Sequence, residues 1–470
     1  MRRMVRPNLC CPRLFVLSLL SIGCCLPLAA QVQSSAGLTL EEAVQDALRD
    51  YPSIHASQET LNAAVAHIHL AQTAYLPHVD GLAQINRATR NTFYGMLLPN
   101  AIIPSLDGSP VNNLGSVWDS GAGLLVSWQP FDLGLRKANV DIARAEKDYA
   151  QASLNLTRFE VAVATADAFL TVIAAEQTQR AAQAAVDSWE VLLHNIHAVV
   201  HAQLRPAADE SRVQSELAAA RTQLFQAQQA FEIARASLSQ FIGLPPAQIG
   251  LNPGKLLNQL PGENFAPTFQ VESNPLVMQQ HAQILQAEAQ MKALQRTYRP
   301  QFLLQASASG RGTGLNTSDG SRLGGWNGLA PTTQNYGIGF TVTFPFMDVA
   351  AVRAQESAQL ATLHAQQQQY RLVTRKLQAD WDAAQAALNG ARRVAQNTPI
   401  EVSSAQTALN QATAQYKAGL TSIDNLAQAQ RLLVQAQIDD ALARLNVWRA
   451  VLQMETVEGD IQPFISEVSK

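Results

Sequence analysis

The sequence contains very little cysteine. Among 470 residues, cysteine occurs only at Cys10, Cys11, Cys24 and Cys25. Removal of an N-terminal segment that holds all four would leave a chain without a thiol. Such a chain has no disulfide framework, no cysteine ligand for a metal and no thiol nucleophile.

Long hydrophobic runs are also missing. No stretch after the N-terminal segment reaches the 18 apolar residues that a membrane-spanning helix requires. Residues 1–30 combine arginines at the start, a short apolar run over 14–20 and small residues before Gln31. These features are typical of a secretory signal peptide, and they predict export with cleavage near Ala30.

The N-terminal segment permits a second interpretation. The letters "SIGC" at 21–24 form a degenerate lipobox, in which Ser21 stands where leucine is usual. Processing at this motif would make Cys24 the lipidated first residue of the mature chain. The sequence leaves open whether the chain is lipidated at Cys24 or cleaved near Ala30.

Neither sign of charge dominates, and the motifs of catalysis are missing. Thirty-four basic residues face thirty-seven acidic ones, which indicates no nucleic-acid partner. The sequence has no nucleophile elbow, no HExxH and no paired-carboxylate motif. The glycines of "GRGTG" at 310–314 lead into no predicted helix, so they form no dinucleotide fingerprint. We therefore expect no catalytic residues, no cofactor and no enzyme.

Three histidines lie near the end of a predicted helix. His194, His197 and His201 follow an i, i+3, i+7 spacing, which places them on one helix face. Three imidazoles there could bind zinc or copper, or sense pH. No fourth ligand is visible, so we favour a polar face whose histidines form hydrogen bonds, and we predict no metal site.

The chain repeats itself over most of its length. "DYPSI" at 50–54 corresponds to "SNPLV" at 273–277, and "QTAYLPHVDG" at 72–81 is echoed 223 positions later by "QRTYRPQFLL". The pattern predicts two long repeats, at 38–242 and 274–457. A linker rich in proline and glycine, 243–273, separates them, and a tail follows at 458–470.

Each repeat contains a very long helical pattern. Residues 135–203 have neither proline nor glycine, and a helix over this range is roughly 100 Å long at 1.5 Å per residue. Turn signals at 204–210 and 418–424 end the two long helices, so each repeat predicts a helical hairpin. Thr398, Pro399 and Glu401 resemble a helix start, so we expect a kink or a restart there.

Two strand-like segments precede the hairpin in each repeat. Apolar and polar residues alternate at 78–86 and 301–309, again at 337–346, and also around Leu124 and Val126. Runs of about 9–11 residues suit tilted strands that cross a bilayer, although strands of a water-soluble sandwich alternate too. Four strands cannot close a barrel, and hydrocarbon does not tolerate open edges. A membrane barrel therefore requires several copies of the chain, two, three or four.

Four segments together resemble a known family. They are "LTLEEAVQDALRDYPSI" at 38–54, "AYLPHVDG" at 74–81, "WQPFDLGLRKANVDIARAE" at 128–146 and "YKAGLTSIDNLAQAQRLLVQAQ" at 416–437. The chain is similar to the TolC-like outer membrane efflux proteins over nearly all of 38–457. Helix would give way to strand at Tyr75 and Pro77, and again at Tyr298 and Pro300.

The resemblance implies a fold, a location and partners. The implied fold is mainly α with a β-barrel portion. Three chains form a 12-stranded barrel in the lipid of the outer membrane and a long α-helical barrel in the periplasm. Such a duct passively conducts substrates that an inner-membrane pump or ABC exporter delivers through a periplasmic adaptor, in tripartite efflux or type I secretion. The substrate, the pump and the adaptor cannot be read from the sequence.

The resemblance also implies roles at the hairpin turns. Gly419 and Leu420 match the adaptor-docking turn, whereas the first repeat keeps Leu204 but lacks the glycine. Asp209 and Asp424 fall at or beside the positions that ring the closed periplasmic entrance. Acidic residues in the first turn of a helix also stabilise that helix, so both interpretations stay open.

One alternative belongs to a different class of protein. A periplasmic coiled-coil scaffold or adaptor would also contain helical hairpins. It would need only one hairpin, and it would lack ten-residue strands bounded by aromatic residues.

Overall fold

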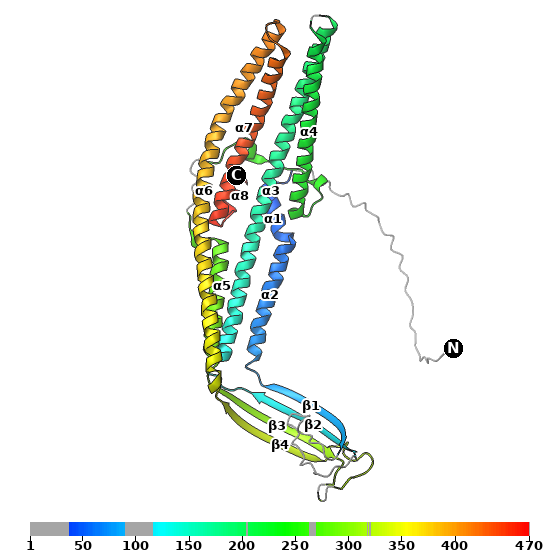
Figure 1. Cartoon of the computed structure of the whole chain (residues 1–470), viewed down its shortest axis with the longest axis vertical. Helices are drawn as coiled ribbons and strands as arrows, with labels where there is room; N and C mark the ends of the chain where they lie inside the picture. The colour runs from blue at the N-terminus through cyan, green and yellow to red at the C-terminus, as the bar shows by residue number, and fades with distance from the viewer. Residues whose placement is uncertain are drawn as a thin grey trace, which may run out of the picture. The chain divides into compact units, whose positions relative to one another are not determined.

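A computed structural model describes residues 37–89, 116–203, 205–262, 269–316, 318 and 321–469. The predicted signal peptide, Cys24 and Leu204 lie outside these residues. The described part of the chain starts at Gly37 (Figure 1).

The first repeat begins with two helices where we expected one. Helix α1 spans Leu40–Asp50 and helix α2 spans Pro52–Thr73. Thr39 caps α1, with its hydroxyl accepting from the backbone N–H of Glu42 while the Glu42 carboxylate accepts from the N–H of Thr39. Pro52 starts α2 because proline tolerates the first helical position, where its missing N–H has no intrahelical partner.

Two long hairpins account for most of the chain. Helices α3 (Leu135–His201) and α4 (Ala207–Ile242) form the first, and α6 (Val349–Lys417) and α7 (Ile423–Glu458) form the second. The 67 residues of α3 correspond to about 100 Å of helix. The two helices of each hairpin pack against each other through small and branched apolar residues. Examples are Leu224 and Ala227 in the first hairpin and Leu433 and Ala436 in the second.

The remaining helices pack around the middle of the hairpins. Helix α5 (Pro275–Leu294) lies along α3 and α6, and α8 (Gln462–Ser469) closes the chain. Short 3-10 turns η2 (Pro246–Gln248), η3 (Gly254–Leu257) and η4 (Val271–Ser273) occupy the segment between the repeats. Trp448 of α7 is fully buried against Phe464 of α8, which ties the C-terminal end to the main core.

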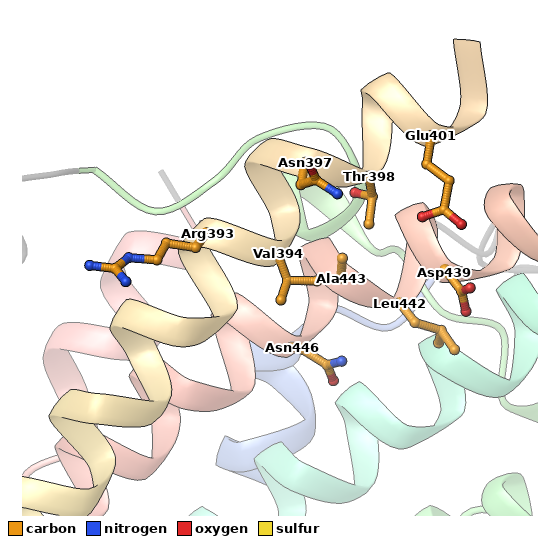
Figure 2. A pocket seen from close by; sticks show the side chains of 9 residues that line it. All are labelled: Arg393, Val394, Asn397, Thr398, Glu401, Asp439, Leu442, Ala443 and Asn446. Carbon is orange, nitrogen blue, oxygen red and sulfur yellow. The ribbon is translucent and has the colours of Figure 1, made fainter. Parts of the chain in front are cut away.

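Helix α6 does not restart at Pro399, so of the two outcomes expected from the sequence the restart is wrong, whereas the kink stays a prediction. The helix continues through the proline to Lys417. Thr398 is buried and, instead of capping a new helix, donates its hydroxyl to Asp440 of α7 at 2.8 Å. A cavity of about 500 Å³ lies beside this contact, between α6 and α7 (Figure 2). Packing against α7 therefore holds the helix together where the proline removes one backbone hydrogen bond.

Four antiparallel strands form one sheet at the end of the helices away from the hairpin turns (Figure 1). The sheet order follows the chain: β1 (His78–Thr89), β2 (Ser116–Trp128), β3 (Gln301–Thr313) and β4 (Thr333–Thr343). The first hairpin and α5 lie in sequence between β2 and β3. Each repeat therefore contributes two neighbouring strands.

The strand register separates an apolar face from a polar face. Residues paired across antiparallel strands share a face, and Val79, Val126, Ala306 and Ile338 form one such row. The neighbouring row on the other face contains His78, Ser127, Gln305 and Gly339. The alternation read from the sequence is thus one continuous apolar face, which suits contact with lipid, and an opposite polar face.

Within the part of the chain that the structure describes, no helix combines the length and the hydropathy needed to cross a bilayer.

Candidate functional site

The two hairpin turns have different backbones. In the second, Gly419 adopts φ +76°, and the N–H of Leu420 donates back to the carbonyl of Gln415. Glycine takes this left-handed conformation without strain, and it leaves the Leu420 side chain 80 % exposed. In the first turn, Gln203 has φ +58°, which is uncommon for a residue with a side chain.

A polar bridge joins the second turn to the first hairpin. The hydroxyl of Tyr416 donates to the carboxylate of Asp209 at 2.9 Å. The guanidinium of Arg205 donates to the carbonyl of Tyr416 at 2.6 Å and lies 4.7 Å over its ring. Tyr416 therefore contacts both Asp209 of α4, through its hydroxyl, and Arg205 of the turn that precedes α4, through its backbone carbonyl and its ring.

The environment of Tyr416 keeps its hydroxyl a donor. Burial, followed by the bond to Asp209, raises the pKa of Tyr416 to about 12. A phenol with this pKa stays protonated throughout the physiological pH range. The bridge to Asp209 therefore does not depend on titration of the tyrosine.

A second bridge lies further along the same two helices. Arg212 of α4 contacts Asp424 of α7 at 3.1 Å. Glu216 is approached by Arg212 at 3.5 Å and by Arg431 of α7 at 3.6 Å. The four charges alternate in sign between the two hairpins, so the contacts favour the arrangement in which α4 and α7 lie together.

The structure thus places both predicted acidic residues in contacts between the hairpins. Asp209 and Asp424 also stand in the first turns of α4 and α7, where a negative charge stabilises a helix. The sequence analysis missed Tyr416 and Arg212. In this later part of the repeats corresponding residues are 216 positions apart, as Asp132 and Asp348 are. Tyr416 and Arg212 then correspond to Val200 and Gln428, so the internal repeat gave no signal for them.

The histidines near the first turn make local contacts. The Nδ1 atom of His197 lies 2.7 Å from the carboxylate of Glu210, and the rings of His197 and His201 are 4.2 Å apart. Among the described residues, no group of three or more His, Cys, Asp or Glu side chains is arranged to hold a metal ion.

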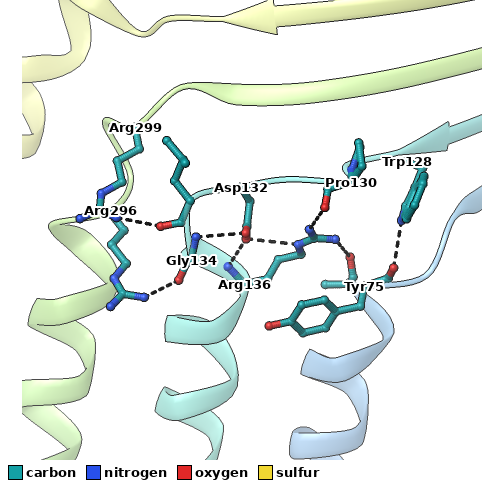
Figure 3. A network of polar contacts seen from close by, with 10 residues as sticks. Tyr75, Trp128, Pro130, Asp132, Gly134, Arg136, Arg296 and Arg299 are labelled. Atoms are coloured by element: carbon teal, nitrogen blue, oxygen red, sulfur yellow. Dashed lines mark hydrogen bonds and ion pairs between the residues drawn. The ribbon is translucent and has the colours of Figure 1, made fainter.

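The first junction between helix and strand is built around Arg136. Its side chain is buried and pairs with Asp132, and it donates to the carbonyls of Ala74 and Pro130 at 3.2 and 3.4 Å (Figure 3). It also lies 4.7 Å over the ring of Tyr75. Bonds to the chain just before β1 and just after β2 fix the helical end of this strand pair.

Two further arginines reach this junction from the second repeat. Arg296 donates to the carbonyl of Gly134 at 2.7 Å, and Arg299 donates to that of Leu133 at 2.8 Å (Figure 3). Leu133 has φ +51° and Gly134 has φ +93°, so two left-handed residues make the turn. The arginines satisfy the carbonyls that this turn exposes.

The junction residues named from the sequence lie between the helices and the strands. Tyr75 and Pro77 fall between the end of α2 and the start of β1. Tyr298 and Pro300 fall between α5 and β3. Proline removes a backbone donor and disfavours helix in the residue before it, which is the change that these positions require.

Comparison with known proteins identifies this combination of hairpins and sheet. The family model described as "Outer membrane efflux protein" matches residues 43–244 and 270–460, well over half of the chain. The chain belongs to this family. Its members are trimeric outer-membrane channels that work with a periplasmic adaptor and an inner-membrane pump, and they are not enzymes.

Individual members resemble the chain along most of its length. The pyoverdine export outer membrane protein OpmQ of Pseudomonas aeruginosa is 25 % identical over 401 residues, covering 84 % of this chain and 80 % of OpmQ. The solved structure of VceC from Vibrio cholerae matches with a TM-score of 0.71 at 16 % identity, covering 90 % of this chain and 96 % of VceC.

A further solved structure gives the same result. The outer membrane channel MtrE of Neisseria gonorrhoeae matches with a TM-score of 0.70 at 18 % identity, covering 90 % of this chain and 89 % of MtrE. The predicted fold class, a long α-helical barrel with a 12-stranded β-barrel shared by three chains, is confirmed. The chain is an outer-membrane efflux duct whose helical part lies in the periplasm.

Proposed function

We propose that three copies of this chain close one exit duct by pairing β1 of each copy with β4 of the next. In the described sheet, β1 pairs with β2 alone and β4 with β3 alone, so each outer strand has one edge available for pairing with another strand. The apolar face would meet lipid and the polar face would line the lumen. The observation that carries the proposal is this two-faced sheet with two open edges, because hydrocarbon does not tolerate an unpaired edge.

We assign adaptor docking to the hairpin turns. Leu420 is exposed beside Gly419 in the turn. This exposure leaves its side chain free to enter an apolar pocket of a partner. Gly419 allows this turn, and Leu204 would serve the same purpose in the first repeat. The partner is a periplasmic adaptor that receives substrate from an inner-membrane pump or an ABC exporter. Replacement of Leu420 by glutamate should abolish efflux without loss of the oligomer.

We further propose that Asp209 and Asp424 hold the periplasmic entrance closed. Tyr416 and Arg212 bind these two carboxylates from the opposite hairpin. Separation of the hairpins breaks both contacts, and adaptor docking at the nearby turns would supply the free energy. The open carboxylates would then favour the passage of cations.

Planar bilayers test the function directly. Purified protein should insert and conduct, and the double variant Asp209→Asn/Asp424→Asn should open more often and prefer cations less. Protein that stays in the soluble periplasmic fraction and never conducts would instead support the coiled-coil scaffold. A double variant with wild-type opening and selectivity would remove the gate role and leave the duct intact.

N-terminal processing stays a prediction of the sequence. Export with loss of residues 1–30 and lipidation at Cys24 leave different N-termini, which intact mass measurement distinguishes. The division into repeats at 38–242 and 274–457, with linker 243–273 and tail 458–470, is likewise our interpretation.

A further inference from the structure

An arginine and tryptophan cluster lies at the end of the sheet that is far from the helices. We define it as Arg87, Trp118, Arg322 and Trp326. The guanidinium of Arg87 lies 5.3 Å over the ring of Trp118, and the rings of Trp118 and Trp326 stack at 6.3 Å with 10° between their planes. Strands β1 and β2 and the segment between β3 and β4 therefore meet in this cluster.

The strand register places the cluster on the apolar, lipid-facing side of the sheet. Arg87 pairs with Trp118, and Trp118 shares a face with Leu124 and Val126 because residues alternate along β2. Ser120 and Asp119 follow Trp118 on alternate faces, so the nearest strand carboxylate points to the other side. The cluster thus continues the surface that meets lipid.

The distance along β2 sets the height of the cluster. Trp128 marks the helical end of the apolar face, and ten residues separate it from Trp118. At about 3.3 Å per residue and a tilt of about 40°, this separation is roughly 25 Å across the membrane. That value equals the height of the apolar band of a membrane barrel, so the cluster lies at the head groups of the outer leaflet.

The segment after β3 is held in place by this arrangement. Arg322 donates to the carbonyl of Ser116 at 3.1 Å, and Arg87 donates to the Ser116 hydroxyl at 3.0 Å. A Cβ added to Gly312 would lie 2.2 Å from the carbonyl oxygen of Ala330, so the segment packs directly on the strand. Both arginines are therefore anchored at one nitrogen, with exposed guanidinium groups.

Charge complementarity identifies the ligand. Neither Arg87 nor Arg322 forms an ion pair with a carboxylate in the part of the chain that the structure describes. Trp326 is 77 % exposed beside them. Arginine binds phosphate in a bidentate manner, and an exposed tryptophan offers a flat face for a sugar ring or a place at the head-group boundary.

We propose that this cluster binds the phosphorylated saccharide head of lipopolysaccharide, the glycolipid of the outer leaflet. Arg87 and Arg322 contact its phosphate groups, and Trp326 packs against the neighbouring sugar. Bound glycolipid would fix the segment between β3 and β4 at the rim of the barrel.

The test measures lipid binding by the detergent-solubilised oligomer. Delipidated wild type in detergent is titrated with mixed micelles of the same detergent that contain lipid A, lipid A without its phosphates, or phosphatidylglycerol. We expect the double variant Arg87→Gln/Arg322→Gln to bind lipid A about tenfold more weakly than wild type. A matched variant, Arg371→Gln/Arg375→Gln, loses the same charge on the exposed surface of α6 and should bind as wild type does.

Two results would overturn the proposal. One is equal affinity of wild type and the Arg87→Gln/Arg322→Gln variant for lipid A. The other is wild-type binding that does not distinguish lipid A from its dephosphorylated form or from phosphatidylglycerol. If the double variant fails to form a heat-dissociable oligomer, the comparison of lipids on wild type still decides, and Trp326→Ala replaces the variant with an expected loss of about threefold.

Discussion

At the scale of single residues, the hydrogen bond from Tyr416 to Asp209 joins the two hairpins, and its loss should alter the equilibrium between the closed and the open entrance. Tyr416 is buried, and its hydroxyl lies 2.9 Å from the Asp209 carboxylate. Loss of a hydrogen bond to a charged group costs about 1.5–3 kcal/mol. A change of this size alters an opening equilibrium by tenfold or more.

Replacement of Tyr416 by phenylalanine keeps the ring and removes the donor. We expect the duct to open about tenfold more often in planar bilayers, because the Asp209 carboxylate loses its partner. Since the pKa of Tyr416 is raised to about 12, the effect should be the same from about pH 6 to about pH 10. Tyr370→Phe on the same helix is the control, and conductance of Tyr416→Phe equal to that control would contradict the gate.

Glu455 makes stability depend on pH. Its carboxyl is fully buried, and neither oxygen has a hydrogen-bond partner among the described residues. Burial, with smaller contributions from Glu458 and Asp460, raises its pKa from 4.5 to about 8. The folded chain therefore holds a proton that the unfolded chain releases between these values, so the free energy of unfolding falls as pH rises through this window.

The variant Glu455→Gln should remove most of this dependence. We expect the wild-type free energy of unfolding to fall by at most about 1.4 kcal/mol per pH unit between about pH 5 and about pH 8, and the dissociation temperature to fall with it. The variant should give a flatter profile in the same heat-dissociation assay. Parallel profiles for both proteins would show that another group carries the effect.

At the scale of elements, the two junctions between strand and long helix are built differently. In the first repeat, Arg136 binds Asp132 and two carbonyls from inside the junction. The position 216 residues later is Val352, which is buried in an apolar contact instead. Val352 cannot form the side-chain bonds that Arg136 forms, so the two strand pairs are joined to their long helices by different contacts.

The substitution Arg136→Leu tests the role of that bond network. We expect a loss of about 3 kcal/mol, because the largely buried Asp132 carboxylate would lose its guanidinium partner and keep only the backbone N–H bonds of residues 134 and 136. Limited proteolysis should cut near residues 130–134 sooner in the variant, and the oligomer should dissociate at a lower temperature. Arg353→Leu, at an exposed position of α6, is the control; equal sensitivity of both variants would contradict the account.

The same scale shows what the sequence can and cannot predict. The long helices follow from the lack of proline and glycine over 135–203, and the strands follow from alternation, because both patterns are local. The break between α1 and α2 at Tyr51 and Pro52 was missed, although a proline disfavours the interior of a helix, because Pro52 was used only as a marker of the repeat. Helix α6 continues through Pro399 because Thr398 binds Asp440, a contact between distant residues.

The candidate site shows the same limit. Asp209 and Asp424 could be named because a family resemblance marks their positions. Tyr416 and Arg212 could not, because their partners lie 207 and 212 residues away on another hairpin. Pairings of this kind depend on how the hairpins pack, and neither periodicity nor the repeat contains that information.

At the scale of the whole molecule, the chain is one third of a duct. Its sheet carries an apolar face and an opposite polar face, and among the described residues both outer strands keep an unpaired edge. Such a sheet is stable in hydrocarbon only when other copies supply the missing pairs. Function therefore begins with assembly, and a single chain has no lumen to gate.

Native mass spectrometry of protein extracted from outer membranes in mild detergent tests this claim most directly. We expect a single species of three chain masses, which dissociates on heating and conducts in bilayers before it dissociates. A folded monomer that remains in aqueous buffer without detergent would contradict the account, because its strand edges would then need no partner.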